Sequence, residues 1–332
     1  MTGPILSRRA LLRGSAAWLG AAAFSTAAQS LLARQALAGR TRLAATGSPY
    51  GDPVPAIDQT TGLALLRLPP DFTYRSFGWI GDPMLDGSPT PGSHDGMAVV
   101  QVLDNRTRDL VLIRNHELAF GPQIGGGGAP LFDPIDAGGA TLAGGTTTLT
   151  FRRGQWLDAR PSLGGTVANC AGGPTPWGSW LTCEETISDG RILGAKIHGW
   201  VFEVPAPSLG PASAQPIEDM GLFKHEAVAI DPLTGFAYET EDNSPNSGFY
   251  RYRPDQPGGG IGSLEAGGAL DMLKVVDVDG ADLRIPMAGQ EFEVEWVPVP
   301  DPALLPDDAV GILLYGGPSG PYRQGEAAGG AR

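Results

Sequence analysis

Three groups of acidic and amide residues have the side chains that hard metal ions require. Their members are Asn115, Glu117, Glu184, Glu185, Glu226, Glu241 and Asp242. Carboxylate and amide oxygens bind calcium, and carboxylates also suit trivalent iron. Because neighbouring residues on a strand point to opposite faces, the pairs Glu184/Glu185 and Glu241/Asp242 need not supply two ligands each.

The elements that must position these residues follow one plan, repeated three times. Each segment has a polar cluster, a strand, a turn, a second strand and an acidic cluster. The segments span residues 94–117, 169–185 and 225–242, with turns at residues 104–108, 174–178 and 231–235. In an antiparallel hairpin the start of the first strand lies beside the end of the second. Three hairpins arranged radially would therefore bring their polar rims to one central channel, as propeller blades do. The alternative is that residues flanking turns are simply polar.

The rest of the chain predicts an all-β fold. Short β-prone runs are separated by a composition of 49 glycines and 30 prolines, and no long helical period is sustained. The runs are residues 110–114, 147–151, 200–204, 236–240, 249–252 and 310–315. A sandwich, a barrel or a propeller would fit this spacing, and the repeated plan favours the β-propeller.

The two cysteines and two of the histidines belong to the same segments. Cys170 and Cys183 could form a disulfide across one hairpin, or Cys170 could offer a thiolate to a transition metal. His116 and His225 each precede an acid expected to face the site, so strand alternation predicts that they point away from it.

The N-terminal 38 residues predict a twin-arginine signal peptide. Arg8 and Arg9 precede an alanine-rich apolar stretch, and Ala36-Leu37-Ala38 resembles a cleavage site. An amphipathic helix or a membrane anchor is the alternative, but the stretch is short for a bilayer span. Residues 39–60 are expected to form a linker or extended arm, and residues 61–332 the β-propeller domain.

The charge balance argues against some classes of partner. The formal net charge is −13, and removal of the signal would take away four arginines and no acid. Such a chain is a poor binder of nucleic acid or of an anionic membrane surface. It also lacks a P-loop, a dinucleotide fingerprint, a metalloprotease motif and a nucleophile elbow.

Several motifs resemble those of the PhoX alkaline phosphatase family. They are Arg114-Asn115-His116-Glu117, the cysteine-containing run over residues 169–185, Lys224-His225-Glu226-Ala227, and residues 238–242 and 248–251. The resemblance implies a β-propeller that hydrolyses phosphomonoesters at a site holding Ca2+ and Fe3+. It also implies export by the twin-arginine machinery, to the periplasm or the medium. We further expect a monomer without a stable membrane anchor.

Carried over by motif, the ligands would be Glu117, Cys170 and Glu226. The resemblance thus favours Cys170 as an iron thiolate over the disulfide. Weaker candidates, as ligands or as supports of ligands, are Asn115, Glu184, Glu185, Glu241 and Asp242.

One family feature is missing from this sequence. PhoX-like chains usually carry an Arg-x-Glu-Gly motif further on, and Arg323-Gln324-Gly325-Glu326 does not match it. We therefore expect a C-terminally truncated or short form. Two alternative functions stay open. The chain could be a non-catalytic, calcium-stabilised binding protein, or a calcium-dependent hydrolase of lactones or other esters.

Overall fold

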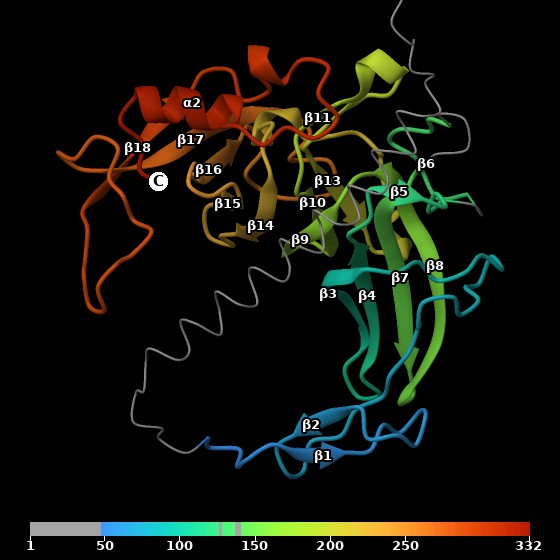
Figure 1. Ribbon diagram of the computed structural model, residues 1–332. Helices are drawn as coiled ribbons and strands as arrows, with labels where there is room; N and C mark the ends of the chain where they lie inside the picture. Colours follow the sequence, from blue (N-terminus) through green and yellow to red (C-terminus); the bar gives the residue numbers. More distant parts are fainter. Residues whose placement is uncertain (1–47, 126–127, 137–140) are drawn as a thin grey trace, which may run out of the picture. The chain divides into compact units, whose positions relative to one another are not determined.

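The computed structural model describes residues 48–125, 128–136 and 141–332 (Figure 1). The predicted signal peptide over residues 1–38 lies outside these residues, as does the first part of the predicted linker or arm. The chain divides into two compact units, with the boundary between Trp79 and Ile80. None of the helices in the described residues combines the length and the apolarity needed to cross a membrane.

The first unit contains one short antiparallel pair, β1 (Val54–Ala56) with β2 (Leu66–Leu68). β1 falls inside the stretch predicted as a linker or arm. Buried Asp58 accepts hydrogen bonds from the hydroxyl of Thr61 and the backbone of Ser76, which fixes the loop around the pair.

The second unit is built on three larger antiparallel sheets. The first has the order β3 (His94–Asp104), β4 (Asp109–His116), β7 (Gly144–Arg152), β8 (Gln155–Thr166). The second has the order β13 (Val201–Pro205), β10 (Ser179–Glu184), β9 (Asn169–Pro174). The third runs in chain order through β14 (His225–Ile230), β15 (Ala237–Glu241), β16 (Phe249–Pro254), β17 (Gly268–Val275) and β18 (Val294–Val299).

Smaller elements complete this unit. Two short pairs are β5 (Phe120–Gly121) with β6 (Thr141–Leu142), and β11 (Ser188–Asp189) with β12 (Ile197–His198). The helix α2 (Gly320–Ala327) contacts β17 and β18 (Figure 1).

The sheets confirm the predicted all-β class. Five of the six predicted strand runs lie in or overlap β4, β7, β13, β15 and β16. Among the described residues no sheet closes on itself, so the propeller stays a prediction.

The sixth run, residues 310–315, was wrongly predicted as a strand. Gly311 adopts a left-handed backbone (φ 73°) two residues after the short 3-10 helix Asp307–Ala309, and this breaks the extended path. The segment is held instead by separate bonds: Gly311 donates to the Asp189 carboxylate, and Tyr315 donates to the Ile187 carbonyl.

Each of the three larger sheets presents an edge strand to the middle of the unit. β9 contacts both β3 and β14 (Figure 1). The approach is close because glycines stand where the backbones meet. A Cβ on Gly96 of β3 would lie 2.8 Å from the Ala171 Cα, and one on Gly173 of β9 would lie 1.8 Å from the Val228 carbonyl oxygen. Side chains at these two positions would push the three sheets apart.

Two apolar clusters hold the sheets against one another. One gathers residues of the second and third sheets, including Leu181 and Tyr250, and adds Phe223 from the segment before β14. The other joins the first and second sheets through Ile113 and Phe202. The inner strands are thus positioned by a core on each side of β9.

Candidate metal centre

The hairpins β3–β4, β9–β10 and β14–β15 pair in the same register at one end. His94 pairs with His116, Asn169 with Glu184, and His225 with Glu241. The candidate ligands are the next residue along each strand: Asp95 and Glu117, Cys170 and Glu185, Glu226 and Asp242. The repeated plan predicted from the sequence is therefore confirmed at the level of pairing.

A β-bulge occupies the same place in all three hairpins. The first strand advances three residues, from His94 to Met97, while its partner advances two, and the other hairpins do the same. The two bulged residues, which lie opposite a single residue of the partner strand, are Asp95-Gly96 in β3, Cys170-Ala171 in β9 and Glu226-Ala227 in β14. A bulge bends its strand and turns a side chain out of the regular alternation. It explains how each first strand adds one chemically active side chain to the same rim.

The ends of the second strands are closed by equivalent backbone bonds. Glu117 donates its N–H to the Ser93 carbonyl at 2.9 Å, and Glu185 donates to that of Ala168 at 2.9 Å. Asp242 donates to that of Lys224 at 3.0 Å. Ser93 and Ala168 adopt left-handed φ angles of 46° and 51°, which are costly for residues with a Cβ. The strained backbone at Ser93 and Ala168 thus lies directly beside Glu117 and Glu185.

Three of these side chains meet closely. One potential ligand atom from each of Cys170, Glu185 and Glu226 lies within 4.8 Å of the others. Cys170 is buried, and Glu185 and Glu226 are half-buried. Both cysteines are free, so the disulfide that the sequence left open is not formed in this structure.

Glu117 and Asp95 form a second acidic pair beside this cluster. Their carboxyl groups share a hydrogen bond. Burial raises the pKa of Glu117 to about 7, and the charges of Asp95 and Glu226 add to the rise. Burial likewise raises the pKa of Asp95. Burial and the mutual repulsion of the two acids thus both favour the protonated form of Glu117.

Glu185 is also a partly buried carboxylate close to other acids. Burial raises its pKa to about 8, and the charges of Glu226, Glu117 and Asp242 contribute, while Lys224 opposes the rise. Burial, with the charges of Cys183, Glu226 and Glu185, raises the pKa of the Cys170 thiol far above its usual value. Buried carboxylates that repel one another are stabilised by a bound cation. The donor set, carboxylates with one thiol, fits calcium and iron.

The comparison with protein families decides the relationship. The model of the family described as Alkaline phosphatase PhoX matches residues 52–162 and 142–327. This chain belongs to the PhoX alkaline phosphatase family. No curated protein and no solved structure gave a match.

In this PhoX family member, Asn115 and Glu184 lie beside the cluster with their polar atoms engaged. The Asn115 amide donates to the carbonyls of Cys170 and Ala171, and its oxygen accepts from Trp180 and Thr182. Fully buried Glu184 accepts from the backbones of Val167, Gly199 and Trp200 and from His198. The hydrogen-bonding capacity of both side chains is thus used within the protein.

Glu241 and Asp242 are neighbours that differ in burial and in hydrogen bonding. Glu241 is buried, and it accepts from the backbone of Gly248 and from the hydroxyl of Tyr250. Burial raises its pKa to about 7 despite those bonds. Asp242 is exposed and acts on Glu185 through its charge.

The two histidines of the motifs point away from the cluster, as strand alternation predicted. His116 is fully buried between the Gly92 carbonyl and the Thr147 hydroxyl. His225 donates from Nε2 to the Gly221 carbonyl, and its Nδ1 lies 3.2 Å from Glu239. Both rings fix the strands that carry the neighbouring acids.

Asp95 is the residue that our sequence reasoning missed. It stood in a polar cluster but was not named as a candidate ligand. The signal was available in the repeat: Asp95-Gly96, Cys170-Ala171 and Glu226-Ala227 are each a ligand-type residue followed by a small one. Only Gly or Ala follows, because the bulged inner strands approach one another closely.

The run Arg323–Glu326 lies in α2 and takes no part in the cluster. Arg323 donates to the Asp308 carboxylate and to the Tyr315 hydroxyl. Its role in this structure is to bind α2 to the segment before it.

Proposed function

We propose that this chain hydrolyses phosphomonoesters and releases inorganic phosphate at a multinuclear calcium and iron site. One observation carries the proposal. Three hairpins of identical register and identical bulge bring Asp95, Glu117, Cys170, Glu185, Glu226 and Asp242 to one rim. Three edge strands meeting in the middle of the unit also support a propeller-like arrangement of the sheets.

The donor set suggests how the ions would divide. Cys170 with Glu185 and Glu226 offers a thiolate and carboxylates, which suit iron. Asp95 and Glu117 offer oxygen alone, which suits calcium. When bound, such ions neutralise phosphate oxygens and activate an oxygen nucleophile.

The acids of the cluster, with Asn115 and Glu184 beside them, would prepare the site for positively charged ions. Burial raises the pKa of Glu117 to about 7 and that of Glu185 to about 8, so a cation that bound there would displace protons from these acids. Asn115 ties β4 to β9 through the carbonyls of Cys170 and Ala171, which keeps two ligand strands in register. Glu184 fixes the end of β10 directly before Glu185.

We further infer that the protein is exported by the twin-arginine machinery, works in the periplasm or outside the cell as a monomer, and needs no membrane anchor. Its acidic surface disfavours nucleic acid as a partner. A folded, metal-loaded domain suits this export route.

The test is to purify the exported chain without chelator and measure bound iron and calcium together with hydrolysis of p-nitrophenyl phosphate. Iron, calcium and turnover together are expected. Calcium without iron or turnover would contradict the proposal and favour the non-catalytic binding protein. Calcium-dependent hydrolysis of p-nitrophenyl acetate or a lactone, with no action on the phosphoester, would favour the esterase-type alternative.

A further inference from the structure

Lys224 is a lysine whose ammonium group has no partner among the described residues. The chain contains only three lysines. Lys196 lies with its ammonium 4.3 Å from the centre of the Phe132 ring, and Lys274 forms ion pairs with two acids. Lys224 makes no ion pair and no side-chain hydrogen bond in the part of the chain that the structure describes. Its side chain is half-buried but its Nζ reaches solvent, so a ligand can contact it.

The backbone places Lys224 at the rim of the metal cluster. It immediately precedes β14, and its carbonyl accepts the 3.0 Å hydrogen bond from Asp242 that closes the third hairpin. Ser93 and Ala168 accept the equivalent bonds in the other two hairpins. Of these three matched positions, only that of Lys224 carries a long cationic side chain.

The charge of Lys224 acts on the cluster. His225, the next residue, points away from the acids, so the alternation of an extended chain predicts that Lys224 points to their side. Electrostatics agrees with this direction, because Lys224 opposes the rise in the pKa of Glu185. It is the only cation among the main charges that shift the pKa of Glu185 or Glu117.

An unpaired ammonium beside a cation site is stabilised by an anion. Under the proposed function, on which this inference rests, bound cations would take up the carboxylate charge of the cluster. Lys224 would then stand beside positive charge without a counter-ion, which is unfavourable unless an anion contacts both. A phosphoryl group has several oxygens that accept from the N–H donors of a lysine, and it is the anion that the proposed reaction brings.

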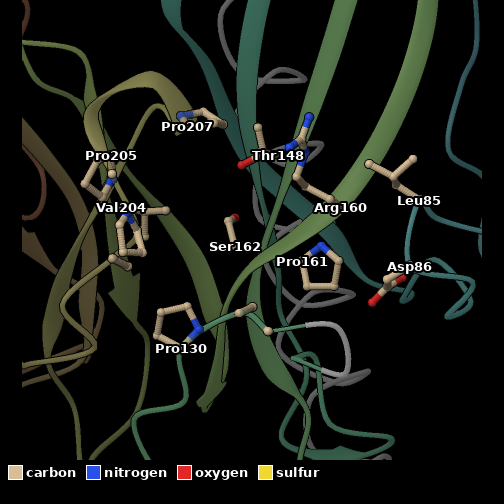
Figure 2. Close-up of a pocket in the computed structure, with 15 residues that line it drawn as sticks. Leu85, Asp86, Pro130, Thr148, Arg160, Pro161, Ser162, Val204, Pro205 and Pro207 are labelled. Atoms are coloured by element: carbon tan, nitrogen blue, oxygen red, sulfur yellow. The ribbon is translucent and has the colours of Figure 1, made fainter.

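The cavity of about 500 Å³ on the first sheet offers no comparable group (Figure 2). Arg160 is the one cationic residue of its described lining, and its guanidinium lies 3.3 Å from the Asp158 carboxylate. Asp86 adds a further acid to the wall. The charge of Arg160 is therefore already balanced, which disfavours phosphate in this cavity.

We propose that Lys224 binds the phosphoryl oxygens of the substrate and holds the phosphate against the metal cluster. It acts as a binding residue and not as a metal ligand, since a lysine ammonium has no acceptor to offer a cation. The same contact serves the bound ester and the transition state, so it lowers KM more than it raises kcat.

The test compares Lys224→Met with Lys224→Arg in the metal-loaded, full-length exported protein. Inorganic phosphate is the probe, measured by calorimetry and as an inhibitor of p-nitrophenyl phosphate hydrolysis. Lys224→Met should weaken phosphate binding about 10- to 50-fold and raise KM by a similar factor, with kcat within about threefold. Lys224→Arg keeps the charge and should bind phosphate within about fivefold of the unchanged protein. Iron and calcium contents should be the same in both variants.

Lys274→Met is the matched control, because it removes the same type of side chain from β17, where Lys274 pairs with Asp279 and Glu295. It should bind phosphate within about twofold of the unchanged protein. Lys224→Gln replaces Lys224→Met where the methionine variant fails to fold.

Two results would overturn the inference and leave the proposed function intact. One is phosphate binding by Lys224→Met as tight as that of the unchanged protein. The other is loss of iron or calcium from Lys224→Met, which would assign the lysine to the support of the metal site. An unchanged protein that neither hydrolyses the ester nor binds phosphate would instead overturn the proposed function, and the inference with it.

Discussion

Glu184 and Glu185 are neighbours in the chain, yet they belong to two different regions of the molecule. Glu184 belongs to a buried network in which His198 bridges it to Asp133, and backbone N–H groups satisfy its remaining lone pairs. Glu185 belongs to the rim cluster, where the nearest charged groups are chiefly other acids and its pKa rises to about 8.

The difference separates acids whose oxygens accept hydrogen bonds from the protein from acids that we propose bind metal. In the buried network each carboxylate accepts hydrogen bonds from donors within the protein. These bonds hold β10 and β12 together and require no bound ion. The rim cluster concentrates carboxylates whose burial and mutual repulsion raise the pKa values of Glu117 and Glu185, and we propose that bound cations relieve this cost. Four experiments test this contrast, from the largest expected effect to the smallest.

Replacing Cys170 with Ala should have the largest effect. It removes the only sulfur at the rim of the described cluster, and we expect iron to be lost and kcat/KM for p-nitrophenyl phosphate to fall by about 100-fold or more. Metal analysis and steady-state kinetics measure both. Cys183→Ala is the control, since Cys183 lies in the core and should keep metal and activity. Retention of iron by Cys170→Ala would exclude the thiolate.

The isosteric pair Glu185→Gln and Glu184→Gln should separate metal binding from stability. Glu185→Gln should weaken calcium or iron binding by about 10–100-fold and relieve repulsion in the metal-free protein. Calcium added to chelator-treated protein at pH 7 should also release fewer protons from this variant, since the proton of Glu185 is gone.

Glu184→Gln should instead lower the free energy of unfolding by about 3 kcal/mol, because it leaves His198 and a backbone donor poorly matched. Urea unfolding and calorimetric metal titration distinguish the two variants. Equal loss of metal from both, with no difference in stability, would contradict the division between the regions.

His198 should make the buried network sensitive to alkali. Burial lowers its pKa, but the charges and hydrogen bonds of Glu184 and Asp133 outweigh burial and raise the pKa to about 9. A raised histidine pKa stabilises the folded state fully below the unfolded value of 6.5, and the contribution disappears as pH rises through about 9.

We therefore expect the free energy of unfolding to fall by roughly 2–3 kcal/mol between pH 6.5 and pH 10 through this group. In His198→Gln that part of the fall should be absent. Urea midpoints across this pH range are the measurement, with the unchanged chain run in parallel. An identical pH profile in the two proteins would show that the histidine is not charged.

Asp242→Asn should have the smallest effect. Asp242 is exposed and acts on Glu185 through its charge, which solvent screens. Calcium affinity should fall by about two- to fivefold at low salt and by less at 0.5 M salt. A loss as large as that of Glu185→Gln would place Asp242 among the direct ligands.

Much of the fold followed from the sequence. The three hairpins and their turns follow from polar clusters spaced around β-prone runs, and the pairings His94–His116, Asn169–Glu184 and His225–Glu241 confirm the hairpins. The failure at residues 310–315 came from the left-handed turn at Gly311, which a run of β-prone residues did not reveal. The closure of a propeller stays a prediction.

The site was predicted only in outline. The sequence determined which side chains could bind metal, because residue type fixes donor chemistry and the hairpin repeat fixes the end of each strand at which they stand. Tertiary structure decided which of them keep their oxygens available. Adjacent residues such as Glu184 and Glu185 differ through the backbone donors and the histidine that other strands bring to one of them. Bulges then bring Asp95, Cys170 and Glu226 to the rim, and a bulge depends on how two paired strands meet, which no single segment encodes.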